Sequence, residues 1–151
     1  MGFLEDIQGE VVAVDTAPLI YFIEQNAAYQ QLLRPFFEGL DRGAFTAVTS
    51  TITLLETLVH PLRQGNQALA EQYRVLLLSS RHLDTYPVTV EIAVEAARLR
   101  ATRQLKTPDA VQLATGLVSG ARYFLTNDAQ LRTIPDLTVL VLDDLVRQRG
   151  T

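Results

Sequence analysis

Three aspartates stand where strands end or where a helix begins, and these are the positions best placed for chemistry. Asp15 directly follows an apolar run at residues 11–14, and Asp128 follows another at residues 123–125. Asp109 falls in the first turn of a predicted helix. In a parallel α/β sheet, ligands bind beyond the carboxyl ends of the strands, where the following helices begin. We therefore expect the three aspartates to meet at one edge of a sheet.

Glu56 is a fourth candidate because of its position on a predicted helix. The apolar residues of segment 52–59 form one arc on a helical wheel, and Glu56 comes four residues after Ile52. At 100° per residue it falls about 40° outside that arc. A carboxylate at such a border is partly buried yet able to face a cleft, and its burial is costly unless a positive charge compensates it.

Four carboxylates gathered at one edge repel one another unless a cation lies among them. Oxygen ligands without His or Cys select Mg²⁺ or Mn²⁺ over zinc. Each acid alone also has a simpler interpretation. Asp15 and Asp128 each suit the N-cap of a following helix, Asp109 suits a helix dipole, and Glu56 suits a solvated helix border. Only the four together indicate a metal site.

Alternating apolar runs and helical patterns must position these acids. We expect buried strands at residues 11–14, 44–48, 123–125 and 137–142, with a weaker candidate at 82–86. Helical periodicity covers residues 18–24, 28–40, 51–60, 66–79, 90–104 and 108–119. Thr107 suits the N-cap of the last of these, Pro108 its first turn and Gly120 its end. The alternation predicts an α/β fold with a largely parallel sheet.

The composition limits the class of protein. A length of 151 residues fits one domain covering residues 1–151. The absence of cysteine excludes disulfides and thiolate metal sites and favours the cytoplasm. We expect neither a signal peptide nor a membrane span, since no apolar run approaches roughly 20 residues. A net charge of −4 argues against binding nucleic acid by bulk charge, but not against cations held between acids and a phosphate.

Four segments surround the acids: Val-Asp-Thr-Ala-Pro-Leu-Ile at 14–20, Leu-Leu-Glu at 54–56, Leu-Lys-Thr-Pro-Asp-Ala-Val-Gln-Leu-Ala-Thr at 105–115, and Phe-Leu-Thr-Asn-Asp at 124–128. Together they resemble the PIN-domain family, most of all the VapC-type toxins of toxin–antitoxin pairs. The likeness runs through nearly the whole chain, and the acids keep the family order. The segments around Asp109 and Asp128 are the most specific, because they match over several neighbouring positions.

The resemblance implies a fold, an activity and partners. The fold is a three-layer α/β/α sandwich with a mainly parallel sheet of about five strands. The activity is endoribonuclease cleavage of structured cellular RNA, with the hydroxyl of Thr126 supporting the metal shell. The family usually forms homodimers, and an antitoxin whose tail fills the acidic cleft holds its toxins inactive.

The carboxylates suggest separate roles. We expect Asp15 and Asp109 to be the core metal ligands, since they begin opposing elements at the sheet edge. Asp128 would complete the shell or hold a second ion, and Glu56 would bind through water or orient the nucleophile. An ion so held polarises the scissile phosphate and activates a bound water for in-line attack.

The RNA-contacting residues are harder to predict. Arg103 and Lys106 end a basic stretch that leads into the Asp109 helix, and they are candidates for contacts with backbone phosphates. An ordinary solvated helix face explains the same stretch equally well. The five tyrosines show no clustering along the sequence, so a base-stacking platform is not predicted.

Two other functions stay open. One is a small-molecule phosphoryl-transfer enzyme with Asp15 as covalent nucleophile. The second aspartate typical of such enzymes is missing, because position 17 is alanine. The other is a non-catalytic interaction module on the same fold.

Overall fold

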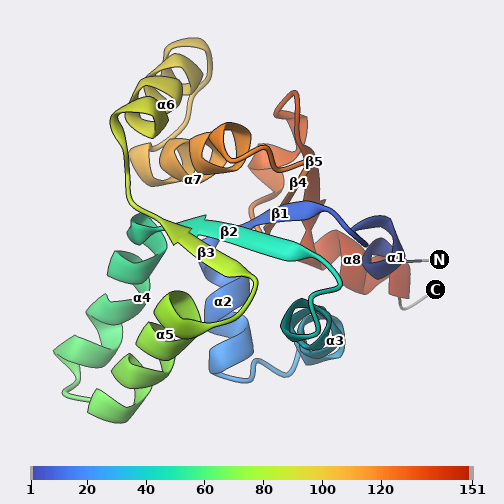
Figure 1. The fold of residues 1–151 in the computed structure, drawn as a ribbon, viewed down its shortest axis with the longest axis vertical. Coiled ribbons are helices and arrows are strands. Elements are labelled where there is room, and N and C mark those ends of the chain that lie inside the picture. Colours follow the sequence, from blue (N-terminus) through green and yellow to red (C-terminus); the bar gives the residue numbers. More distant parts are fainter. Residues whose placement is uncertain (1, 150–151) are drawn as a thin grey trace.

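A five-stranded parallel sheet forms the centre of the structure, a computed structural model that describes residues 2–149 (Figure 1). Its strands are β1 (Val11–Val14), β2 (Thr46–Ser50), β3 (Leu83–Tyr86), β4 (Tyr123–Thr126) and β5 (Thr138–Val141), in the order β3-β2-β1-β4-β5. Every neighbouring pair is parallel. The predicted α/β fold with a parallel sheet of about five strands is therefore confirmed.

Helices cover both faces of the sheet. They are α1 (Phe3–Asp6), α2 (Thr16–Ile23), α3 (Gln30–Asp41), α4 (Thr51–Arg63), α5 (Gln67–Ser79), α6 (Val90–Thr102), α7 (Thr107–Val118), the 3₁₀ helix η1 (Ala129–Thr133) and α8 (Leu142–Arg149). Figure 1 shows α6 and α7 on one side of the sheet and α2, α3 and α5 on the other. No helix within residues 2–149 is long and apolar enough to cross a membrane.

Strand β1 is buried from both sides, which explains its unbroken apolar sequence. Val12 and Val14 belong to the core on the side of α2 and α3, whereas Ala13 belongs to the core on the side of α6 and α7. Helix α7 lies very close to β1, because a Cβ added to Gly116 would stand 3.0 Å from the Cβ of Ala13. This close packing fixes the helix that carries Asp109.

Several element ends differ from those predicted. Strand β2 begins at Thr46 rather than at residue 44, and α2 begins at Thr16 rather than at residue 18. Helix α7 begins at Thr107, so Lys106 rather than Thr107 is its N-cap, without a side-chain cap. Helices α1 and α8 were not predicted; α8 begins directly after β5, with no turn residue between them to mark a boundary.

Candidate metal centre

Asp15 occupies the junction between β1 and α2 and is tightly held there. Its backbone N–H extends the sheet by donating to the carbonyl of Leu125 on β4, 2.9 Å away. Its side chain caps α2, since Oδ1 accepts from the backbone N–H of Thr16 at 2.8 Å. The second oxygen, Oδ2, accepts from the hydroxyl of Thr126 at 2.7 Å. Asp15 is thus both a helix cap and a group fixed at the carboxyl edge of the sheet.

The pKa of Asp15 indicates what surrounds its carboxylate. This pKa is raised from 3.8 to about 6, chiefly by burial; the negative charges of Asp109 and Glu56 also raise it, whereas its hydrogen bonds with Thr126 and the Thr16 N–H lower it. A carboxylate in this state is destabilised by its surroundings. It therefore favours a positive charge in its neighbourhood.

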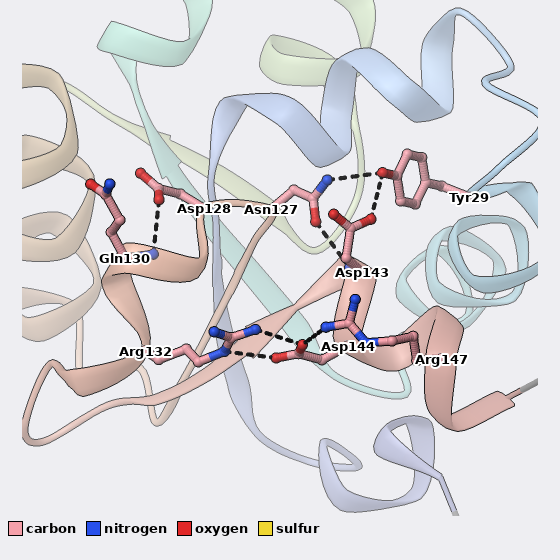
Figure 2. A network of polar contacts seen from close by, with 8 residues as sticks. All are labelled: Tyr29, Asn127, Asp128, Gln130, Arg132, Asp143, Asp144 and Arg147. Atoms are coloured by element: carbon pink, nitrogen blue, oxygen red, sulfur yellow. Dashed lines mark hydrogen bonds and ion pairs between the residues drawn. The ribbon is translucent and has the colours of Figure 1, made fainter. Parts of the chain in front are cut away.

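Thr126 joins Asp15 to Asp128. Thr126 is the last residue of β4 and is fully buried. Its hydroxyl donates to Asp15 and accepts from the backbone N–H of Asp128 at 3.0 Å. Asp128 in turn caps η1, because its Oδ1 accepts from the backbone N–H of Gln130 at 3.0 Å (Figure 2). One hydroxyl therefore ties together the two aspartates that follow the neighbouring strands β1 and β4.

Replacing Thr126 by valine is expected to destabilise the fold. The substitution keeps the shape of the side chain but leaves the Asp15 carboxylate and the Asp128 N–H without this partner, which typically costs about 1–3 kcal/mol. For a domain of this size, that corresponds to a fall of roughly 3–10 °C in melting temperature. Thr126→Ser, which keeps the hydroxyl, is the control. Equal melting temperatures for the two variants would contradict the structural role of this hydroxyl.

Asp109 approaches the same edge from helix α7. It lies in the first turn of α7, half-buried. Burial raises its pKa, and the charges of Asp128 and Glu56 raise it further, whereas Lys106 lowers it. Asp109 is thus within electrostatic range of two other acids, and Lys106 is the nearby cation that the sequence suggested.

Glu56 comes from the opposite side of the site, on α4. Its side chain is exposed, and its Oε1 accepts a hydrogen bond of 2.8 Å from the hydroxyl of Thr16. Thr16 is the residue after Asp15. The position of Glu56 at the border of the apolar arc therefore places its carboxylate beside the start of α2.

The donor set fits a hard divalent cation. The acids offer only oxygen, and within residues 2–149 none of the four forms a salt bridge that would neutralise it. In the same range, no group of three or more His, Cys, Asp or Glu side chains is close enough to hold a metal ion as it stands. Repulsion between like charges favours such a spread arrangement. The joint ligation of one ion by these acids stays a prediction.

The basic stretch before α7 has a partly structural role. The guanidinium of Arg100 donates to the carbonyl of Leu105 and to the hydroxyl of Thr107, both at 3.0 Å. Arg100 therefore clamps the loop that leads into α7. Arg103 is the C-cap of α6 and begins this loop, three residues before Lys106. A contact of Arg103 or Lys106 with RNA stays a prediction.

Two tyrosines that look unrelated in the sequence pack together. The rings of Tyr21 and Tyr29 stack with centroids 4.4 Å apart and planes 8° apart. The amide of Asn127 donates to the Tyr29 hydroxyl at 3.0 Å, and that hydroxyl donates to Asp143 at 2.7 Å (Figure 2). Asn127 also accepts from the backbone N–H of Asp143 at 2.9 Å, so it anchors the start of α8. These two tyrosines, separated in the sequence, are therefore brought together by the fold.

A cavity of about 650 Å³ lies away from the acids. It is lined by residues of α2, α3 and α5 such as Phe22, Phe37 and Leu76, and none of the four acids lines it. The raised pKa values of Asp15 and Asp109 belong to the sheet edge and not to this cavity. We therefore place the candidate site at the sheet edge.

Fold and site together define an α/β protein with acids from four segments at the carboxyl edge of a parallel sheet. The PIN domain profile matches residues 12–137, and the chain belongs to the PIN domain family. A comparison with curated protein sequences gives no match.

Solved structures with this fold include toxins and their complexes. VapBC2 from Rickettsia felis, bound to a DNA fragment from its promoter, aligns with a TM-score of 0.69 and 16% identity over 87% of this chain and 98% of that chain. A toxin–antitoxin complex from Klebsiella pneumoniae aligns with a TM-score of 0.66 and 22% identity over 87% of this chain and 97% of that chain. VapC20 of Mycobacterium tuberculosis, a sarcin–ricin loop cleaving toxin, aligns with a TM-score of 0.60 and 18% identity over 76% of this chain and 86% of that chain. The expected likeness to VapC-type toxins is confirmed for the fold.

Proposed function

We propose that this chain is a Mg²⁺- or Mn²⁺-dependent endoribonuclease and the toxin of a type II toxin–antitoxin pair. The observation that carries the proposal is the mutual electrostatic effect of acids from distant segments: Asp109 and Glu56 raise the pKa of Asp15, and Asp128 and Glu56 raise that of Asp109. Membership of the PIN domain family and the likeness in fold to VapC20 support an activity on RNA.

Each acid is assigned a role. Asp15 and Asp109 would be the core metal ligands, Asp128 would complete the shell or hold a second ion, and Glu56 would bind through water or orient the nucleophile. A bound divalent ion would supply polarisation of the scissile phosphate and activation of a water for in-line attack. The chain's own part is to hold these oxygens still: Thr126 and the Thr16 N–H fix Asp15, and the Thr16 hydroxyl holds Glu56.

Substrate binding depends on local cations. The chain has a net charge of −4, so bulk attraction to RNA is weak. Lys106 is exposed and lies within electrostatic range of Asp109. We assign Lys106, with Arg103 in the same loop, to contacts with the RNA backbone beside the acids.

A cleavage assay tests the proposal. The purified chain is expected to cut a structured RNA with Mg²⁺ or Mn²⁺ and to stop when EDTA is added. Asp109→Asn should lose this activity, whereas Asp84→Asn, which changes an exposed acid on β3 instead, should keep it. Cleavage that survives both EDTA and Asp109→Asn would refute the metal mechanism. Hydrolysis of small phosphate esters without RNA cleavage would favour the phosphoryl-transfer enzyme, and inactivity on both would favour the non-catalytic module.

The proposal includes two protein partners and a cytoplasmic setting. The Klebsiella pneumoniae structure is a toxin–antitoxin complex, which supports a cognate antitoxin here. Helix α4 exposes the apolar side chains of Leu55, Val59 and Leu62 at helical spacing, which supports a homodimer through this face. Size-exclusion chromatography with light scattering tests the dimer, and a monomer at all concentrations would exclude it.

A further inference from the structure

A single amide lies buried between the segments that carry the acids. Gln112 is on α7, one turn after Asp109, and only 3% of it is exposed. A buried amide is costly unless its donors and acceptor are all satisfied. Gln112 Oε1 accepts from the hydroxyl of Ser50 at 2.7 Å, and Nε2 donates to the hydroxyls of Thr16, at 3.2 Å, and Thr53.

The surroundings fix the direction of these hydrogen bonds on the side of α4. Ser50 accepts from the backbone N–H of Ile52 at 3.2 Å, so its own proton is free to go to Gln112. Thr49 donates to the carbonyl of Val14 at 2.9 Å, and a carbonyl only accepts. The Thr53 hydroxyl accepts from Gln112 and lies 2.9 Å from the hydroxyl of Thr49 and 3.1 Å from that of Thr16.

The same logic determines the hydrogen bonds of Thr16. A carboxylate only accepts, so the Thr16 proton goes to Glu56 and the Thr16 oxygen accepts from Gln112. If the amide were turned over, its carbonyl would attract the Thr16 proton away from Glu56. The Ser50 hydroxyl would also lose its acceptor. In the orientation of the structure, Oε1 accepts from Ser50 and Nε2 donates to Thr16 and Thr53, so both ends of the amide have partners.

We propose that Gln112 is a positioning residue of the metal centre: its amide donates to the Thr16 oxygen, holds the Thr16 hydroxyl in place to donate to Glu56, and so keeps the Glu56 carboxylate beside Asp15. The inference rests on the proposed function, because it assigns Glu56 to the metal site. Gln112 acts on Glu56 only through Thr16. It lies on the same helix as Asp109, one turn further along α7.

The affinity of the purified chain for Mn²⁺ tests this inference without any assay of activity. Gln112→Met keeps the length of the side chain and removes both amide groups. It is expected to weaken Mn²⁺ binding roughly 10-fold, the usual size of the loss when a partner of a metal ligand is removed. Thr115→Val is the matched control. Thr115 is equally buried one turn along α7, but its hydroxyl donates only to the carbonyl of Val111 at 2.7 Å.

A double-mutant cycle separates positioning from a general loss of structure. If Gln112 acts through Glu56, Gln112→Met should not weaken Mn²⁺ binding further in a Glu56→Gln background. Independent, additive losses would overturn the inference, as would a Gln112→Met variant that binds Mn²⁺ as tightly as wild type. Asp15→Asn tests the metal site separately: if it abolishes binding while Gln112→Met has no effect, the proposed function stands and the inference fails.

The wild-type protein provides a second measurement in case Gln112→Met does not fold. In a ¹⁵N-labelled sample, the two side-chain N–H signals of Gln112 should exchange with solvent far more slowly than those of the exposed Gln64. Exchange as fast as that of Gln64 would show that the network is not formed and would overturn the inference.

Discussion

Asp15→Asn is expected to reduce RNA cleavage by at least roughly 100-fold while the chain stays folded. Loss of a mere partner of a metal ligand already costs about 10–100-fold, and Asp15 is assigned as a ligand itself. Its carboxylate is also the one that Thr16 and Thr126 hold most firmly. The measurement is the initial rate of cleavage of one structured RNA at a saturating Mg²⁺ concentration.

The fold should tolerate this change for an electrostatic reason. At neutral pH, Asp15 is ionised in a buried position close to other negative charges, and its pKa is raised to about 6. A shift of about two pKa units corresponds to about 3 kcal/mol of destabilisation of the ionised form. Asparagine removes that charge and keeps an acceptor for the Thr16 N–H. The metal-free variant should therefore melt no lower than the wild type.

Thr115→Val serves as the control for cleavage, since it changes a buried hydroxyl away from the acids. Full activity in Asp15→Asn would remove Asp15 from the site. An unfolded variant would contradict the electrostatic argument.

Mg²⁺ or Mn²⁺ is expected to stabilise the fold, and EDTA to reverse the gain. At roughly 100 times its dissociation constant, an ion that binds only the folded state adds about 2.7 kcal/mol. This corresponds to a rise of roughly 5–10 °C in melting temperature for a domain of this size. Differential scanning fluorimetry with and without each ion measures the effect.

The sign of the pH dependence follows from Asp15. Its pKa is higher in the folded chain, about 6 against 3.8, so between these values the folded state binds more protons than the unfolded state. The stability of the metal-free protein should therefore fall as pH rises through this window. Metal binding needs the ionised carboxylate, so the gain from Mg²⁺ should be larger at pH 8 than at pH 5.

Asp15→Asn is again the informative control, because it should remove both the metal effect and its dependence on pH. A melting temperature that is indifferent to both ions at pH 8 would argue strongly against the site. An equal rise in melting temperature with Mg²⁺ at pH 5 and at pH 8 would show that metal binding does not depend on the ionisation of Asp15.

The sequence predicts the sheet well because its signals are local. Four strands overlap short apolar runs, whereas the more polar β3 was only a weaker candidate; Val12 to Val14 are buried as an unbroken run predicts. The positions of Asp15 and Asp128 follow from strand ends alone. The ends of the elements are predicted less well. Asp15 itself caps α2, so this helix begins at Thr16 and not at residue 18, where the apolar periodicity begins.

Other features could not be predicted because they depend on contacts between distant segments. Tyr21 and Tyr29 stack only after the chain turns between α2 and α3. Gln112 is a buried polar residue of α7, and its role is visible only when Ser50 on β2 and Thr53 on α4 lie against it. The periodicity of the helix does not show which distant residues this amide meets.

The pairing of β4 with β1 has a consequence for the order in which the protein becomes active. Residues 11–56 supply Asp15 and Glu56, whereas Asp128 is delivered by a strand that begins only at Tyr123 and pairs with Val12. A nascent chain emerging from the ribosome therefore cannot bring Asp128 beside Asp15 until β4 has been made and has paired with β1. Under the proposed nuclease function, a chain that stops before β4 would lack part of the site, so activity would arise only after this strand is in place.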